Sequence, residues 1–128
     1  MLYLPDGYKR KPLPGKKAWV AALRSGKYKQ GVGYLCFYGD YCCLGVLCEV
    51  QSRPNQPTET TIIFDYSEMA LSRANPLYGK LGAEGDLPDG VDWKGLSNLA
   101  KINDDGATFS EIADIIDASW YDEQEEQP

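Results

Sequence analysis

The chain has 128 residues, of which 43% are hydrophobic, and its formal net charge is −6. This length supports one ordinary hydrophobic core and is short for two domains, so we expect a single domain. No apolar run approaches the roughly 18 residues of a membrane span, and residues 1–10 lack the apolar centre of a secretory signal. We therefore expect a cytoplasmic protein with no membrane partner.

Side chains that carry common catalytic chemistry are scarce. The sequence has no histidine, so histidine-based triads are excluded, and no spacing singles out another acid–base pair. Its four cysteines, Cys36, Cys42, Cys43 and Cys48, lie among apolar and aromatic neighbours and lack the C-x-x-C spacing of a zinc site. We expect packed free thiols, no metal, no cofactor and no catalytic residue, which is typical of a binding protein rather than an enzyme.

Charge is divided unevenly along the chain. Residues 1–30 hold eight basic groups and one acid, a net charge of +7, whereas the remaining residues have a net charge of −13. A basic first quarter on an acidic body is suited to attracting a small anion. The alternative is that these bases pair with the acidic end of the same chain, and the pattern leaves both interpretations open.

Residues 1–15 contain three prolines and two glycines, which interrupt regular structure, and they are predicted to form an extended basic arm. Residues 16–25 follow as a helix, because Trp19, Ala22 and Leu23 share one helical face and Gly26 is a suitable stop. The domain is expected to cover residues 16–121, and residues 122–128 form an acidic tail.

Residues 27–66 are predicted to contain a small antiparallel sheet. An aromatic strand at residues 34–38 precedes a two-residue turn at Gly39-Asp40, and residues 58–66 are rich in strand-favouring side chains. Residues 42–50 fit either a helix or a strand, and we favour a short helix because their apolar side chains also recur at helical spacing.

Residues 74–95 are predicted to form a long connection in which Tyr78 and Trp93 either close over a ligand or pin the loop to the core. Two helices then flank a turn at residues 103–106, and Thr108 and Glu111 match a capping box. The expected fold is α+β, with a small antiparallel sheet packed by an N-terminal helix and a C-terminal helical pair.

The expected anion site lies near residues 24–30, at the end of the first predicted helix, and aromatic residues from other segments are added to it. The guanidinium of Arg24 can present a planar fork to a phosphate or carboxylate, and aromatic rings can stack on a base. The candidates are Trp19, Arg24, Lys27, Tyr28, Gln30, Tyr41, Tyr78 and Trp93.

Three stretches of the sequence also carry a family likeness. They are W-x-x-A-L-R-S-G-x-Y-x-Q at residues 19–30, Y-C-C-L-G-V-L-C at residues 41–48 and N-D-x-G-x-x-F-x-E-I-A-D-x-I at residues 103–116. Together they resemble a family of small bacteriophage and prophage proteins that are mostly uncharacterised. The resemblance implies a phage accessory protein acting inside an infected bacterium, and no established activity comes with it.

Three functions are compatible with these features. The first is a non-catalytic binder that sequesters a nucleotide-type signal of bacterial defence, acting as a homodimer. The second is an inhibitor that docks on a host enzyme through an acidic C-terminal face that includes Glu111, Asp114 and Asp117. The third, a nucleic-acid-binding regulator, is disfavoured because residues 99–128 hold one base and nine acids, which would repel a phosphate backbone.

Overall fold

The computed structural model describes residues 2–52, 71, 73 and 75–123, and it confirms the predicted α+β class. The predicted strand at residues 58–66 lies outside the described residues. In chain order the elements are β1 (Leu2–Tyr3), β2 (Lys11–Pro12), α1 (Lys16–Arg24), β3 (Lys29–Gln30), β4 (Cys36–Phe37), β5 (Asp40–Tyr41), α2 (Cys43–Ser52), α3 (Tyr78–Leu81), β6 (Asp92–Trp93), α4 (Leu99–Asp104), α5 (Phe109–Ser119) and β7 (Trp120–Tyr121).

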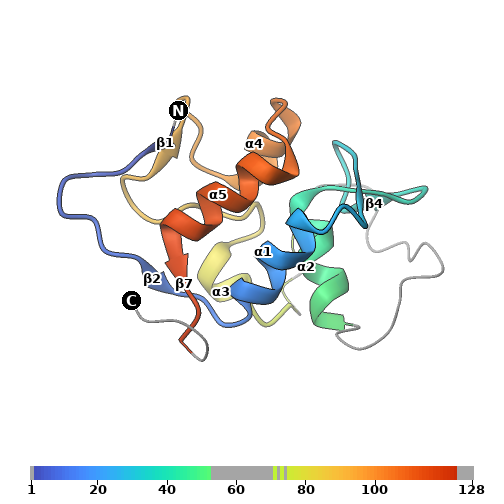
Figure 1. Ribbon diagram of the computed structural model, residues 1–128, viewed down its shortest axis with the longest axis horizontal. Coiled ribbons are helices and arrows are strands. Elements are labelled where there is room, and N and C mark those ends of the chain that lie inside the picture. Colours follow the sequence, from blue (N-terminus) through green and yellow to red (C-terminus); the bar gives the residue numbers. More distant parts are fainter. Residues whose placement is uncertain (1, 53–70, 72, 74, 124–128) are drawn as a thin grey trace.

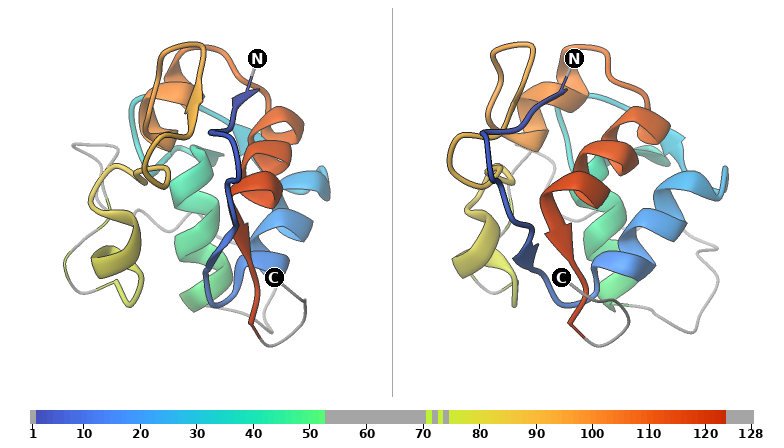
Figure 2. Two further views of the ribbon diagram at one scale, coloured as in Figure 1. Left: turned by 90° about the vertical axis from the view of Figure 1, so that its left-hand side faces the viewer. Right: turned by 60° about the vertical axis from the view of Figure 1, so that its left-hand side comes forward.

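Helices form the centre of the molecule. The N-terminal helix α1 packs against both α2 and α5, and α4 packs against α2 and α5 (Figure 1). The buried face of α1 contains Trp19 and Leu23, as their helical spacing predicted, together with Val20, whereas the third predicted residue, Ala22, is partly buried. It meets a buried face of α5 that includes Ile112 and Ile116, so the two ends of the chain share one hydrophobic core (Figure 2).

The helix α2 lies deepest in the core. Residues 42–47 are all buried, and the helical alternative for this cysteine-rich stretch is confirmed. A Cβ atom added at Gly45 would lie 1.7 Å from the carbonyl oxygen of Leu35. This helix is therefore apolar around its first turns and approaches neighbouring backbone too closely for any side chain at Gly45.

A three-stranded sheet with the order β3-β5-β4 lies beside the start of α2. The strands β4 and β5 pair in antiparallel fashion as expected, whereas β3 joins β5 in parallel. The turn between β4 and β5 is formed by Tyr38 and Gly39, both with positive φ, and Asp40 pairs with Phe37. The prediction of a Gly39-Asp40 turn was one residue too late, because the glycine occupies the second of two positions that need positive φ.

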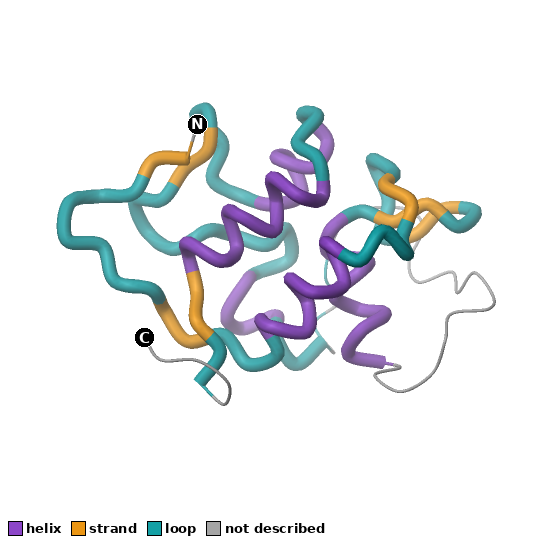
Figure 3. The backbone as a smooth tube through the Cα atoms, in the orientation of Figure 1, coloured by secondary structure: helices purple, strands orange, loops and turns teal. Residues whose placement is uncertain are grey.

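The N-terminal arm is part of the fold. Residues 2–15 contain no helix, and they run along the molecule between two short pairings, β1 with β6 and β2 with β7 (Figure 3). Leu13 is fully buried at the end of this arm. Because β7 directly follows α5, the arm joins the beginning of the chain to its last described helix.

The C-terminal helical pair begins with side-chain caps at both helices. Asn98 accepts a hydrogen bond from the Lys101 amide at the start of α4. Thr108 accepts one from the Glu111 amide, and Glu111 accepts one from the Thr108 amide, which confirms the predicted capping box. Within the described part of the chain, no helix is long and apolar enough to cross a membrane.

Candidate ligand pocket

Arg24, the leading candidate for an anion ligand, lies between two carboxylates of α5. Its guanidinium is 2.5 Å from the Asp114 carboxylate and 3.4 Å from the Asp117 carboxylate. The side chain of Lys16, almost fully buried on α1, also pairs with Asp117. Two basic side chains of α1 and two acidic side chains of α5 thus neutralise one another, so the basic first quarter pairs in part with the acidic C-terminal helix.

Gln30, Trp19 and Tyr41 hold the fold together. The Gln30 amide donates to Asn103 Oδ1 at 2.9 Å and to the Ala107 carbonyl at 2.8 Å. Trp19 is fully buried, and its indole nitrogen donates to the Cys43 carbonyl at 2.9 Å. Tyr41 is also buried, with its ring edge-on to Tyr28. The structure brings Tyr28 and Tyr41 together, and each of these contacts orders the region between α1, α2 and α4.

The two aromatic residues of the predicted long connection differ in exposure. Trp93 is buried at 6% exposure, pairs with Leu2 across β1 and β6, and packs against the core, with the ammonium of Lys94 4.5 Å from its ring centre. Tyr78 is half-buried at the start of α3, while Lys27 is exposed. The assignment of these residues as ligand contacts stays a prediction.

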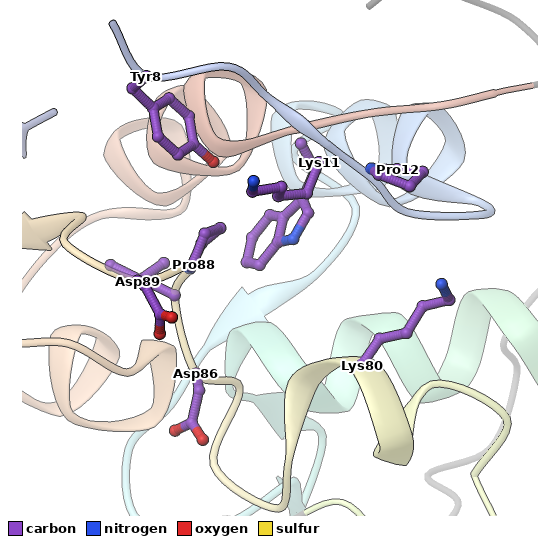
Figure 4. A pocket seen from close by; sticks show the side chains of 9 residues that line it. Tyr8, Lys11, Pro12, Lys80, Asp86, Pro88 and Asp89 are labelled. Atoms are coloured by element: carbon purple, nitrogen blue, oxygen red, sulfur yellow. The ribbon is translucent and has the colours of Figure 1, made fainter. Parts of the chain in front are cut away.

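A pocket of about 500 Å³ lies elsewhere, between the N-terminal arm and the segment that follows α3 (Figure 4). We call it the arm pocket. It is lined by Tyr8, Lys11, Pro12, Lys80, Asp86, Leu87, Pro88, Asp89 and Trp120. None of the eight ligand residues predicted from the sequence is among them.

The arm side of the pocket is fixed to the end of α5. The Tyr8 hydroxyl donates to the Ser119 carbonyl at 2.5 Å, and the Arg10 guanidinium donates to the carbonyls of Asp117 and Trp120 at 3.3 Å each. Lys11 is opposite Trp120 in the register of β2 and β7. These bonds fix the backbone of the arm to the end of α5 and to β7, so this wall of the pocket is held in place by the fold.

The facing side is a turn held by its own backbone. The Leu87 amide donates to the Ser97 carbonyl at 2.9 Å, and the Val91 amide donates to the Pro88 carbonyl at 3.0 Å. Gly90 in this turn has φ +84°, and a Cβ atom there would lie 2.8 Å from Pro5 Cγ. Glycine is therefore needed where the turn touches the arm.

The charged groups of the arm pocket are exposed and available. Lys11, Lys80, Asp86 and Asp89 make no side-chain hydrogen bond or ion pair within the described part of the chain. Burial raises the pKa of Tyr8, although Arg10 opposes this shift, so its phenol stays neutral and is no general base near pH 7. The pocket therefore combines two free cations and two free carboxylates with the buried Trp120 ring.

The cysteines are poorly suited to nucleophilic chemistry. Burial raises the pKa of Cys42 to about 12 and that of Cys48 to about 11, and it also raises the pKa of Cys36 and Cys43. The thiolate is the reactive form, so these thiols are held in the unreactive state at neutral pH. Among the residues that the structure describes, no group of histidine, cysteine or acidic side chains is arranged to hold a metal ion.

Sequence reasoning missed the arm pocket for a physical reason. Its walls come from the arm, from the turn after α3 and from β7, which are distant in sequence and carry no shared motif. Asp86 and Asp89 have the character of turn residues, and the structure places Asp89 in a turn but Asp86 in a β-bridge with Asn98. The one sequence feature that pointed to this pocket was the presence of Tyr8 and Lys11 in a segment rich in proline.

Comparison with known proteins gives one match. A family model described as Domain of unknown function (DUF8296) matches residues 14–74. No curated protein and no solved structure matches the chain. The matched range contains α1, the three-stranded sheet and α2, whereas every residue that lines the arm pocket lies outside it.

Proposed function

We propose that the protein is a non-catalytic binding protein for a small nucleotide-type anion and that the arm pocket holds this ligand. The observation that carries the proposal is the presence of two unpaired lysines, Lys11 and Lys80, around a preformed hollow that contains Trp120. By contrast, Arg24 and Lys16 are already neutralised by α5. Lys11 and Lys80 are therefore free to bind an incoming anion, although Asp86 and Asp89 line the same pocket.

The size and lining of the pocket support this ligand class. Small-molecule sites commonly measure about 300–1,000 Å³, and the arm pocket, at about 500 Å³, falls in this range. Lysine ammonium groups bind phosphate as point charges, while the half-buried Tyr8 offers aromatic surface to a flat base beside the buried Trp120. A mononucleotide, which has both parts, matches the pocket better than a simple inorganic anion.

The chemistry of the surrounding residues supports binding without turnover. The chain has no histidine, the Tyr8 phenol is neutral, and burial keeps the thiols protonated. The resemblance to bacteriophage and prophage proteins provides a context in which such binding is useful. In the cytoplasm of an infected bacterium, the protein would remove a nucleotide signal of the host defence by holding it.

The proposal is tested by following thermal unfolding with a panel of linear and cyclic nucleotides. A ligand at 100 times its Kd stabilises the folded state by about 2.7 kcal/mol. The Lys11→Ala and Lys80→Ala variants should each weaken this effect, whereas the matched variant Lys27→Ala, at an exposed lysine outside the pocket, should not. Recovery of the nucleotide unchanged is expected.

Three results would contradict the proposal. Absence of any nucleotide-dependent shift would reject a nucleotide ligand, and chemical conversion of the nucleotide would make the protein an enzyme. Loss of binding in Lys27→Ala or Arg24→Ala, with full binding in both pocket variants, would move the site to the position that the sequence predicted.

We further propose that the expected homodimer forms through the tip of the β4–β5 hairpin. Tyr38 is 84% exposed and Phe37 43% exposed, and nearby Val32 is 60% exposed. The Phe37 ring stacks on Tyr34 at 4.6 Å between ring centres, which makes an ordered apolar surface of the kind that a second copy can cover. Sedimentation velocity should show a dimer that Tyr38→Ser converts to a folded monomer, and a monomeric unsubstituted protein would refute this.

A further inference from the structure

The two carboxylates of the arm pocket are unexpected in a site for an anion. Asp86 and Asp89 line the same hollow as Lys11 and Lys80, and Figure 4 shows them on the turn that faces the arm. Their negative charge would repel a phosphate, so another part of the ligand must compensate for it. We propose that Asp86 and Asp89 accept hydrogen bonds from the base, and that the arm pocket selects guanine over adenine.

The carboxylates and the ammonium groups of the pocket are held apart. No ion pair joins them, since none of these side chains has an acidic or basic partner within 4.0 Å among the described residues. The turn that carries the carboxylates is fixed by the Leu87 and Val91 backbone bonds, and the arm is fixed by Tyr8. Lys11 lies on the arm, whereas the two carboxylates lie on the facing segment, next to the helix α3 that carries Lys80. The separation of Lys11 from the carboxylates suits a ligand that has donors at one end and phosphate at the other.

The carboxylate of Asp86 lies beside Gly82 at the end of α3. The Asp86 amide donates a hydrogen bond to the Leu81 carbonyl at the end of α3, at 2.5 Å. A Cβ atom at Gly82 would lie 2.9 Å from Asp86 Oδ2, and Gly82 has φ +68°. The glycine therefore leaves room for the carboxylate beside the helix end, and any larger residue would push it out of place.

The two oxygens of a carboxylate accept hydrogen bonds, so the base that they bind must present two neighbouring donors. Guanine presents neighbouring donors, the ring N1–H and the exocyclic N2–H₂, and a carboxylate can accept from both at once. Adenine presents a donor beside an unprotonated ring nitrogen, which a carboxylate repels. One well-formed bidentate contact of this kind discriminates between bases by roughly 5- to 150-fold in affinity.

This inference rests on the proposed function, and its test separates the two. The affinities of GMP, IMP and AMP are measured by isothermal titration calorimetry on the full chain. GMP should bind at least about fivefold more tightly than AMP, and IMP, which lacks the exocyclic donor, should fall between them. Asp86→Asn and Asp89→Asn should each reduce this preference while leaving AMP binding intact, and the charge-matched variant Asp105→Asn, outside the pocket, should keep it.

Three other outcomes would overturn the guanine preference. Equal affinity for GMP and AMP in the unsubstituted protein would overturn the guanine preference and leave the proposed function standing. A preference that survives in both pocket variants would show that other residues select the base, which also overturns the inference. Failure of all three nucleotides to bind would overturn the inference and would count against the proposed function as well.

Discussion

Replacement of Asn103 should be among the most destabilising single changes in this protein. Asn103 is 1% exposed at the end of α4, and its amide group donates to the Gly31 carbonyl at 2.8 Å. Its Oδ1 accepts from the Gln30 side chain at 2.9 Å and from the Cys43 amide at 3.2 Å. Because Cys43 is the first residue of α2, Asn103 supplies a cap to that helix from a distant part of the chain.

The size of the effect follows from these bonds. Asn103→Ala removes three hydrogen bonds worth about 0.5–1.5 kcal/mol each and leaves the buried Cys43 amide unpaired, which adds about 1–3 kcal/mol. A total loss of about 2.5–7.5 kcal/mol is expected from these terms, against a typical stability of roughly 5–15 kcal/mol for a domain. Asn103→Asp keeps the acceptor but loses the donor to Gly31, so it should also destabilise the fold.

The assay is urea unfolding followed by tryptophan fluorescence. An unchanged slope of the unfolding free energy against urea concentration shows that the variant exposes the same surface on unfolding. Asp105→Ala, at an exposed position two residues further on, is the control and should change the free energy of unfolding by less than about 0.5 kcal/mol. If Asn103→Ala cost under about 1 kcal/mol, the role of this residue as a link between α2, α4 and the sheet would be refuted.

Three further changes test the core and its ion pairs. Gly45→Ala should destabilise the fold by about 3 kcal/mol in urea titrations because its Cβ would meet the Leu35 carbonyl, whereas Gly79→Ala, with open space around it, should cost almost nothing. Burial acts to raise the pKa of Asp117, but its two basic partners hold that pKa below the ordinary value of 3.8. The ionised Asp117 side chain therefore stabilises the fold fully at pH values above its pKa in the unfolded chain. This stabilisation is lost as the pH falls through the lower pKa that Asp117 has in the folded protein. Between about pH 5 and pH 3, Asp117→Asn should lose less stability than the unsubstituted protein, and equal losses would contradict this. Iodoacetamide at pH 8 should leave the four cysteines of the folded protein largely unmodified by mass spectrometry, since burial raises the pKa of each; rapid alkylation would contradict their burial.

Local patterns in the sequence predicted the helices well. The spacing of Trp19, Ala22 and Leu23 identified α1, and Thr108 with Glu111 identified the beginning of α5. These signals work because the contacts that form a helix and its cap lie within four residues of each other. The β4–β5 hairpin was also found from its glycine, although the turn was placed one residue late.

Pairings between distant residues were not predictable in the same way. The strands of the arm are two residues long, and two-residue strands leave no alternation for a sequence to display. Arg24 is a suitable anion ligand by its chemistry alone, and only the packing of α1 on α5 shows that Asp114 and Asp117 already occupy it. Gln30 looked available for the same reason, although its donors are used by the core.

The most direct test of the central claim is an NMR titration of the isotopically labelled protein with GMP. The arm pocket predicts that the largest shifts occur at the amides of Lys11, Lys80 and Asp89 and at the indole N–H of Trp120. Residues 24–30 should change little. Shifts concentrated at residues 24–30, with the pocket residues unmoved, would contradict the account and restore the site predicted from the sequence.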